Sequence, residues 1–142
     1  MAWDAPVSTA AAGVAAVALA VAGVLATAPA ASAATYNGAC GSGYQQVQST
    51  PITGMSGSSM GRLFLTYNDS TGYKCAVTVS DVGHPVTMSA GIKRSSAGSW
   101  VEDEGKYTSY AGPVYTYARG QCVDYSGRID GASKTLVDAY CK

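Results

Sequence analysis

Cysteines are the residues with the clearest chemistry in this chain, and there are four of them, Cys40, Cys75, Cys122 and Cys141. If the chain is exported, as its first residues indicate, an even number of cysteines predicts two disulfides. Of the three pairings we favour Cys40 with Cys75 and Cys122 with Cys141, because neighbours along the chain close shorter loops. Each bridge should stabilise the fold by about 3–4 kcal/mol. A zinc site is disfavoured, because the spacings contain no C-x-x-C pair and the lone His84 is a poor fourth ligand.

Two features could belong to a hydrolase. Residues 57–61 match the pattern G-x-S-x-G, which would make Ser59 a nucleophile. That pattern works on a sharp turn between a buried strand and a helix, whereas here a Gly/Ser-rich loop precedes it and a strand follows. His84 is the only histidine and so the only candidate general base near neutral pH, but a Gly-His-Pro turn beside Asp81 is typical of a solvated histidine. The sequence therefore favours a protein without catalytic residues.

Acidic side chains could in principle hold a hard cation such as calcium. Glu102, Asp103 and Glu104 are consecutive, and consecutive residues of a strand point to opposite faces, so these oxygens should not converge. Residues 68–71 also offer oxygens, but they depart from the crystallin-type calcium loop, which has Ser or Thr where Gly72 stands. We expect no metal ion and no cofactor.

Aromatic residues gather in the last third of the chain. An exposed strip of such residues could stack on the sugar rings of a polysaccharide or anchor a protein partner. The alternative is that the tyrosines fill the hydrophobic core, because the chain contains a single phenylalanine. The residues that we predict to face a ligand are Trp100, Tyr107, Tyr110, Tyr115 and Tyr117.

The elements that position these residues are predicted to be strands. Apolar and polar residues alternate and no sustained helical period follows residue 33, which indicates an all-β domain, a small antiparallel β-sandwich or barrel. The best hairpin joins residues 63–67 to residues 73–79, and a five-residue loop places Leu65 opposite Cys75 on one apolar face.

The remaining elements follow from the same alternation and from turn-forming residues. A second hairpin is expected from residues 114–118 to residues 121–125 through a two-residue loop, after a break at Gly112-Pro113. The other expected strands are residues 44–48, 86–92, 107–111 and 135–141, with one more entered at Trp100-Val101, and the rest of residues 37–61, residues 95–99 and residues 126–133 are expected to be loops.

An export signal is predicted at the start of the chain. Residues 10–28 are almost wholly apolar, and Ala31-Ser32-Ala33 fits a signal peptidase, so residues 1–33 are expected to be cleaved and residues 34–142 to form the secreted domain. The opening residues are acidic rather than basic, and the apolar run approaches the roughly 20 residues that span a bilayer. A retained anchor is the alternative; the alanine content of the run and the absence of Lys or Arg before Arg62 disfavour it.

Size and charge restrict the partners. The mature part has 109 residues, which is one domain. It contains all nine basic residues and eight of the nine acidic ones, for a formal charge of +1. Such a balance produces no strong field, so nucleic acid and anionic membranes are not expected as partners.

Several segments, in this order, resemble spore-associated protein A of filamentous actinobacteria. The resemblance spans most of the mature chain, includes all four cysteines, and implies a small exported protein found with aerial hyphae and spores, without an established enzymatic activity or catalytic residues. The segments are residues 36–44, 65–68, 74–79, 110–115 and 120–125.

Together these observations favour a non-catalytic secreted protein that binds a polysaccharide or protein at the spore or cell surface. A polysaccharide-binding module is one form of this hypothesis. The alternative is a secreted inhibitor of an extracellular hydrolase, which would present the loop at residues 95–99 or Arg119-Gly120. A small hydrolase that uses His84 is the third and least favoured class.

Overall fold

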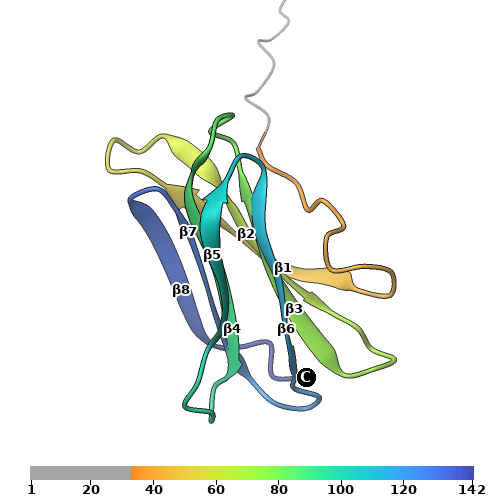
Figure 1. Ribbon diagram of the computed structural model, residues 1–142. Helices are drawn as coiled ribbons and strands as arrows, with labels where there is room; N and C mark the ends of the chain where they lie inside the picture. The colour runs from red at the N-terminus through yellow and green to blue at the C-terminus, as the bar shows by residue number, and fades with distance from the viewer. Residues whose placement is uncertain (1–32) are drawn as a thin grey trace, which may run out of the picture. The chain divides into compact units, whose positions relative to one another are not determined.

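The computed structural model describes residues 33–142, which form a sandwich of two antiparallel sheets (Figure 1). The all-β prediction is confirmed, and a sandwich is the one of the two expected architectures that is found. No helix in this region is long and apolar enough to cross a membrane. The strands are β1 (Gln45–Thr53), β2 (Ser59–Tyr67), β3 (Tyr73–Ser80), β4 (Val86–Arg94), β5 (Val101–Tyr107), β6 (Tyr110–Tyr117), β7 (Val123–Ile129) and β8 (Ala132–Ala139).

Each sheet has four strands. Sheet A has the order β1-β2-β3-β6, and sheet B has the order β5-β4-β7-β8. The chain passes from one sheet to the other after β3, after β5 and after β6. Pro51 and Pro113 lie in β1 and β6, which are the edges of sheet A, where a residue without an N–H is tolerated.

The predicted hairpin of residues 114–118 and 121–125 is wrong. β6 pairs with β3 in sheet A, whereas β7 pairs with β4 and β8 in sheet B, so the turn at Arg119-Gly120 is a crossover between sheets. Gly112-Pro113 does not end a strand either. β6 continues through it with a bulge, since Gly112 adopts φ +96° and passes close to the carbonyl of Ala76 on β3.

The core lies between the two sheets. The predicted strand at residues 86–92 is confirmed within β4, and its alternate side chains point inward, fully or almost fully buried. Tyr125 on β7 is completely buried, and its hydroxyl donates to Gln48 Oε1 on β1 at 2.8 Å. The largest apolar members of the core are Ile52, Leu63, Leu65, Val86, Met88, Ile92, Val114, Val123, Tyr125 and Ile129.

The β2–β3 hairpin is present, but the predicted register is wrong by one residue. Leu65 lies opposite Ala76 rather than Cys75, and Asn68 N–H donates to Tyr73 O, which leaves residues 69–72 as the loop. The predicted register assumed that only one face of β3 is buried. β3 is instead buried on both faces, because Cys75 and Val77 are covered from outside the sandwich.

Two regions expected to be loops are largely strand. The short strand at residues 44–48 is found, but β1 continues to Thr53 and β2 already begins at Ser59. Residues 126–133 likewise belong mostly to β7 and β8, joined by a tight turn in which Asp130 takes φ +56°. Polar β-residues at the surface of an antiparallel sheet resemble loop composition, which is why these strands were missed.

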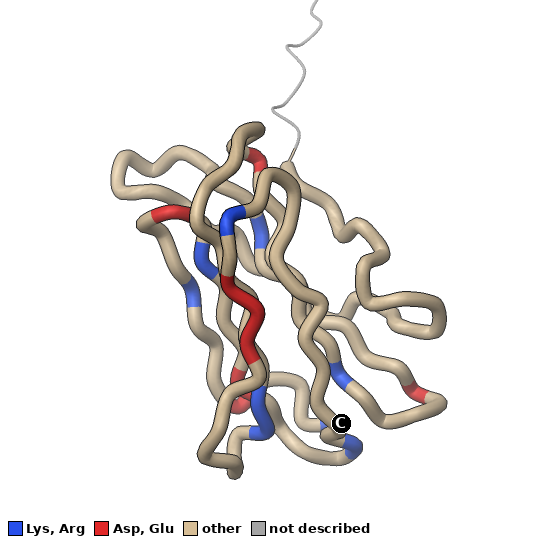
Figure 2. Tube along the Cα trace, viewed as in Figure 1, with Lys and Arg blue, Asp and Glu red and all other residues tan. Residues whose placement is uncertain are grey.

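Charged residues are spread over the domain rather than gathered on one surface. Figure 2 shows acidic residues next to one another along β5 and basic residues scattered over both sheets. The predicted signal peptide lies outside the described residues, apart from Ala33.

Candidate functional site

The segment at residues 34–44, here called the strap, covers part of the outer face of sheet A. Cys40 is joined to Cys75 on β3, and Cys40, Cys75 and Val77 form a small buried cluster with partly buried strap residues around it. The Cys40 N–H donates to the hydroxyl of Tyr36 at 3.1 Å, and the Tyr36 ring lies 6.0 Å from that of Phe64. The strap is therefore fixed to the sheet by a covalent bond and by packing.

Four tyrosines lie on the part of this face that the strap leaves open. Tyr73 on β3 and Tyr110, Tyr115 and Tyr117 on β6 are 42%, 40%, 37% and 45% exposed. β3 and β6 are paired, so Tyr73 stands opposite Tyr117, and their rings are 5.7 Å apart. We call these four residues the tyrosine face.

The strap also holds Tyr115, one member of the tyrosine face, in place. The Tyr115 hydroxyl donates to Cys40 O at 2.9 Å, and the Tyr115 ring meets that of Tyr44 edge-on at 5.6 Å. Burial between strap and sheet raises the pKa of Tyr44 and of Tyr115. These rings are thus presented by a fixed backbone rather than by a loop.

Trp100 and Tyr107 do not join the tyrosine face, although the sequence grouped them with it. Trp100 lies beside sheet B, close to Gly91 and with Lys93 Nζ 5.7 Å from its ring. Tyr107 is half-buried, and its hydroxyl donates to Asp103 at 2.6 Å, a bond that raises the pKa of this tyrosine. Tyr73 was missed because its place beside β6 depends on the pairing of β3 with β6.

The residues that suggested hydrolysis do not form a serine–histidine pair. The Ser59 hydroxyl donates to Asp81 Oδ2 at 3.3 Å, and Nδ1 of the exposed His84 lies 3.4 Å from the carbonyl of Pro85. A nucleophilic serine is activated by a base that a third group orients. The base here would be the Asp81 carboxylate, and within residues 33–142 no further side-chain hydrogen bond orients it.

The acidic run on β5 diverges, as expected from its strand position. Asp103 points inward and accepts hydrogen bonds from Tyr107 and from Gly112 N, whereas Glu104 pairs with Arg128 at 3.7 Å. Within residues 33–142, no group of three or more His, Cys, Asp or Glu side chains is arranged to hold a metal ion.

The two suggested inhibitory loops are both held by contacts within the domain. Arg119 donates from Nη2 to Asp69 O at 3.0 Å. In the loop that follows β4, the carbonyls of Ser95 and Ala97 accept from Lys93 Nζ at 3.4 and 2.8 Å.

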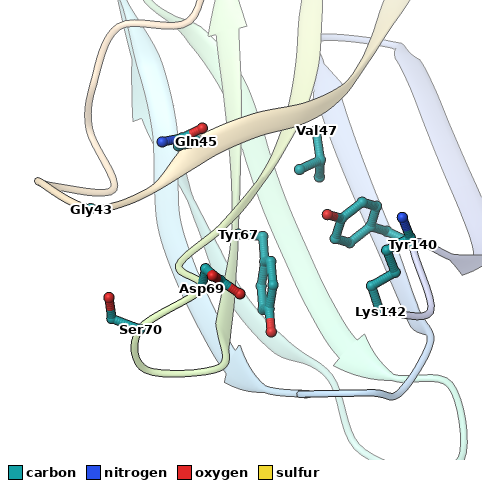
Figure 3. Close-up of a pocket in the computed structure, with 8 residues that line it drawn as sticks. All are labelled: Gly43, Gln45, Val47, Tyr67, Asp69, Ser70, Tyr140 and Lys142. Carbon is teal, nitrogen blue, oxygen red and sulfur yellow. The ribbon is translucent and has the colours of Figure 1, made fainter.

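A cleft of about 700 Å³ lies at one end of the sandwich, and no sequence pattern indicated it. Figure 3 shows the polar Gln45, Asp69 and Ser70 on one side of the Tyr67 ring, and Val47 and Tyr140 on the other. We call it the end cleft. Its remaining lining residues are Gly43 and Lys142.

A buried lysine supports the aromatic wall of the end cleft. Lys74 is completely buried, and its ammonium donates to the carbonyls of Gln121 at 2.6 Å and of Tyr140 at 2.5 Å. Its nitrogen also lies 5.4 Å from the ring of Tyr67 and 5.2 Å from that of Tyr140. Burial lowers the pKa of Lys74. Because Gln121 and Tyr140 precede the bonded Cys122 and Cys141, the lysine and the second disulfide hold the same two segments together.

Comparison with known proteins places the chain in a family. Spore-associated protein A of Streptomyces coelicolor (strain ATCC BAA-471 / A3(2) / M145) is 50% identical over 115 residues, which cover 76% of this chain and 71% of that protein. The chain belongs to the spore-associated protein A family. The resemblance recognised in the sequence is confirmed. No protein-family model and no solved structure matches the chain.

In this member of the spore-associated protein A family, one carboxylate links three segments of sheet B. Asp124 on β7 accepts from Ser95 Oγ at 2.6 Å and from Asp138 N at 3.0 Å, and it lies 3.2 Å from Lys93 Nζ. Burial alone would raise the pKa of Asp124, but the hydrogen bonds and the charge of Lys93 lower it below the ordinary 3.8.

Acid should therefore weaken the fold through Asp124. A carboxyl group whose pKa is lower in the folded state contributes its full stabilisation to the fold at pH values above its unfolded-state pKa. That stabilisation is lost as the pH falls below 3.8 and through the lower folded-state pKa. Asp124→Asn should lower the free energy of unfolding by about 1–3 kcal/mol at pH 6 and by clearly less at pH 3. Urea unfolding at both pH values measures this, with the exposed Asp69→Asn as control. Equal losses at the two pH values would contradict it.

Proposed function

We propose that this protein is exported and acts at the spore or cell surface by binding, without catalysis, and that the tyrosine face is its recognition surface. The relative is named a spore-associated protein, which supports the location. The observation that carries the binding role is the set of four tyrosines, each more than one third exposed, on one face of two paired strands.

The chemistry of the tyrosine face fits recognition of a polysaccharide or a protein. Each ring offers apolar area together with a hydroxyl, and aromatic anchors dominate the energy of many interfaces. Tyr115 is held by its bond to Cys40, and Tyr73 and Tyr117 are packed against each other, so binding requires little ordering of these side chains. A formal charge of +1 on the mature part means that ionic attraction contributes little.

The proposal of a non-catalytic role is supported by the surroundings of the candidate catalytic groups. Ser59 donates to the carboxylate of Asp81 rather than to a histidine, and His84 is an exposed turn residue. The four tyrosines, by contrast, are each more than one third exposed, and Tyr73, Tyr115 and Tyr117 are held by contacts within the domain.

Removing the exposed rings should strongly reduce retention of the protein on cell wall or spores. We expect Tyr73→Ser, Tyr110→Ser and Tyr117→Ser, combined in one variant, to reduce retention on purified cell wall or spores at least tenfold, since each anchor contributes on the order of 1 kcal/mol or more. A sedimentation assay with increasing protein concentration measures the retained fraction. Tyr115 is left in place because its hydroxyl bonds the strap.

A matched variant removes exposed apolar side chains from sheet B instead. Val101→Ser with Val137→Ser should be retained like the original protein, because these residues, 46% and 64% exposed, lie outside the tyrosine face. Retention of the triple variant at the level of the original protein would overturn the proposal. Binding of the protein to secreted hydrolases, with no binding to cell wall or spores, would instead favour the alternative function, inhibition of an extracellular hydrolase.

A further inference from the structure

We propose that the end cleft is a second binding site and that it takes a pyranose unit of a neutral glycan. The proposal rests on the proposed binding role and names the chemistry of the ligand. It is carried by the lining of the cleft, the balance of charge between its lining side chains and the rigidity of its walls.

The lining matches the two kinds of surface that a sugar ring presents. A pyranose has C–H groups on its faces and hydroxyls around its rim. Tyr67, Tyr140 and Val47 offer an apolar and aromatic wall, and Gln45, Asp69 and Ser70 offer an amide, a carboxylate and a hydroxyl opposite it (Figure 3). A volume of about 700 Å³ falls within the range of about 300–1,000 Å³ that is usual for ligand sites.

The charges around the end cleft favour a neutral ligand. Among its lining residues, the charged side chains are one carboxylate, that of Asp69, and one ammonium, that of Lys142. Lys74 lies beneath the rings of Tyr67 and Tyr140, and its ammonium donates hydrogen bonds to two backbone carbonyls. A phosphate or a polyanionic chain would find no cluster of cations here, and a purely apolar ligand would leave the polar wall without partners.

The walls are fixed before any ligand arrives. Tyr140 adopts φ +41°, in the left-handed region where a bulky residue is rare, and it is held there by Lys74 through its carbonyl and by the neighbouring Cys141 disulfide. On the polar side, Asn68 Oδ1 accepts from the N–H groups of Ser70 and Thr71 and so shapes the loop. A strained residue held by several contacts at a cleft is typical of a ligand site.

The end cleft lies next to the tyrosine face along the chain. Gly43, on the rim of the cleft, is followed by Tyr44, which packs on Tyr115. The loop that carries Asp69 and Ser70 ends at Tyr73. The end cleft and the tyrosine face are thus joined through Tyr44 and through the loop that leads to Tyr73.

Titration with defined oligosaccharides tests the proposal. We would record amide NMR spectra of the 15N-labelled protein with tetramers of β-1,4-linked N-acetylglucosamine and of β-1,4-linked glucose, each up to about 10 mM. At least one tetramer should shift the amide signals of residues 43–47, 69–70 and 140–142. Gln45→Ala should weaken that binding about three- to tenfold and Asp69→Ala at least tenfold, because each removes a hydrogen bond to a hydroxyl.

A neighbouring residue provides the matched control. Gln46 is exposed on the same strand but does not line the end cleft, so Gln46→Ala should bind like the original protein. The proposal is overturned if neither tetramer shifts the cleft signals, or if Gln45→Ala and Asp69→Ala bind as Gln46→Ala does. Shifts confined to Tyr110, Tyr115 and Tyr117 would overturn the proposal that the end cleft binds the glycan and would support binding at the tyrosine face. Full wall retention of the triple tyrosine variant, together with tetramer binding at the end cleft, would overturn the tyrosine face while supporting the end cleft.

Discussion

Replacing Cys40 and Cys75 together by alanine should lower the free energy of unfolding by about 4 kcal/mol. This bridge closes a separation of 35 residues, and the chain-entropy model assigns about that stabilisation to a loop of such length. The loss would be a large share of the 5–15 kcal/mol that is usual for a folded domain. It should also free the strap, because Cys40 is the strap's covalent attachment to sheet A.

Denaturant unfolding followed by tyrosine fluorescence measures the change, and limited proteolysis reports on the strap. Cleavage within residues 34–44 should become much faster, because the strap then keeps only its packing on sheet A and the hydrogen bond from Tyr115 to the carbonyl of residue 40. The Cys122→Ala, Cys141→Ala variant is the control. Its bridge closes only 19 residues, so it should cost about 3 kcal/mol and leave the strap protected. A smaller loss for the first pair than for the second would contradict the prediction.

The strap also explains which parts of the fold could be predicted from the sequence. Alternation places β4 and the β2–β3 hairpin correctly, because one buried face is enough to specify a strand. It gives the wrong register for Leu65, because β3 packs against the core on one side and against the strap on the other. A segment without strand periodicity that covers a sheet leaves no pattern of its own, so its effect on β3 could not be foreseen.

The pairing of distant strands limited the prediction of the sites in the same way. Tyr110, Tyr115 and Tyr117 share β6 and could be grouped from their spacing, but Tyr73 joins them only because β3 pairs with β6. The chain crosses between sheets on both sides of β6, and nothing in the turn at Arg119-Gly120 distinguishes a crossover from a hairpin. The end cleft combines three segments that lie far apart along the chain, so no local motif could reveal it.

Lys74→Met should lower the free energy of unfolding by about 2 kcal/mol at pH 7. Burial lowers the pKa of Lys74, so the positive charge is itself a cost to the fold, and methionine removes that cost. What methionine cannot replace is the donor to the carbonyls of Gln121 and Tyr140, and each unsatisfied buried acceptor costs about 1–3 kcal/mol. The lost hydrogen bonds outweigh the relief of the charge. Urea unfolding measures the difference, and the exposed Lys106→Met should stay within about 0.5 kcal/mol of the original protein.

The pH dependence of the stability difference distinguishes the loss of the hydrogen-bond donor from the loss of the positive charge. Between the lowered pKa of Lys74 and 10.5, the unfolded state holds the proton that the folded state has released, so the stability of the original protein gains from this group as the pH rises. A neutral lysine still donates, and the gap between the original protein and Lys74→Met should therefore widen in this alkaline window. A gap that narrows with rising pH would contradict the prediction, because it would mean that the charge of Lys74 stabilises the fold. A variant as stable as the original protein at pH 7 would mean that the two carbonyls need no donor. Tyr140 would then be held by the Cys122–Cys141 bridge alone, and the aromatic wall of the end cleft would not depend on Lys74.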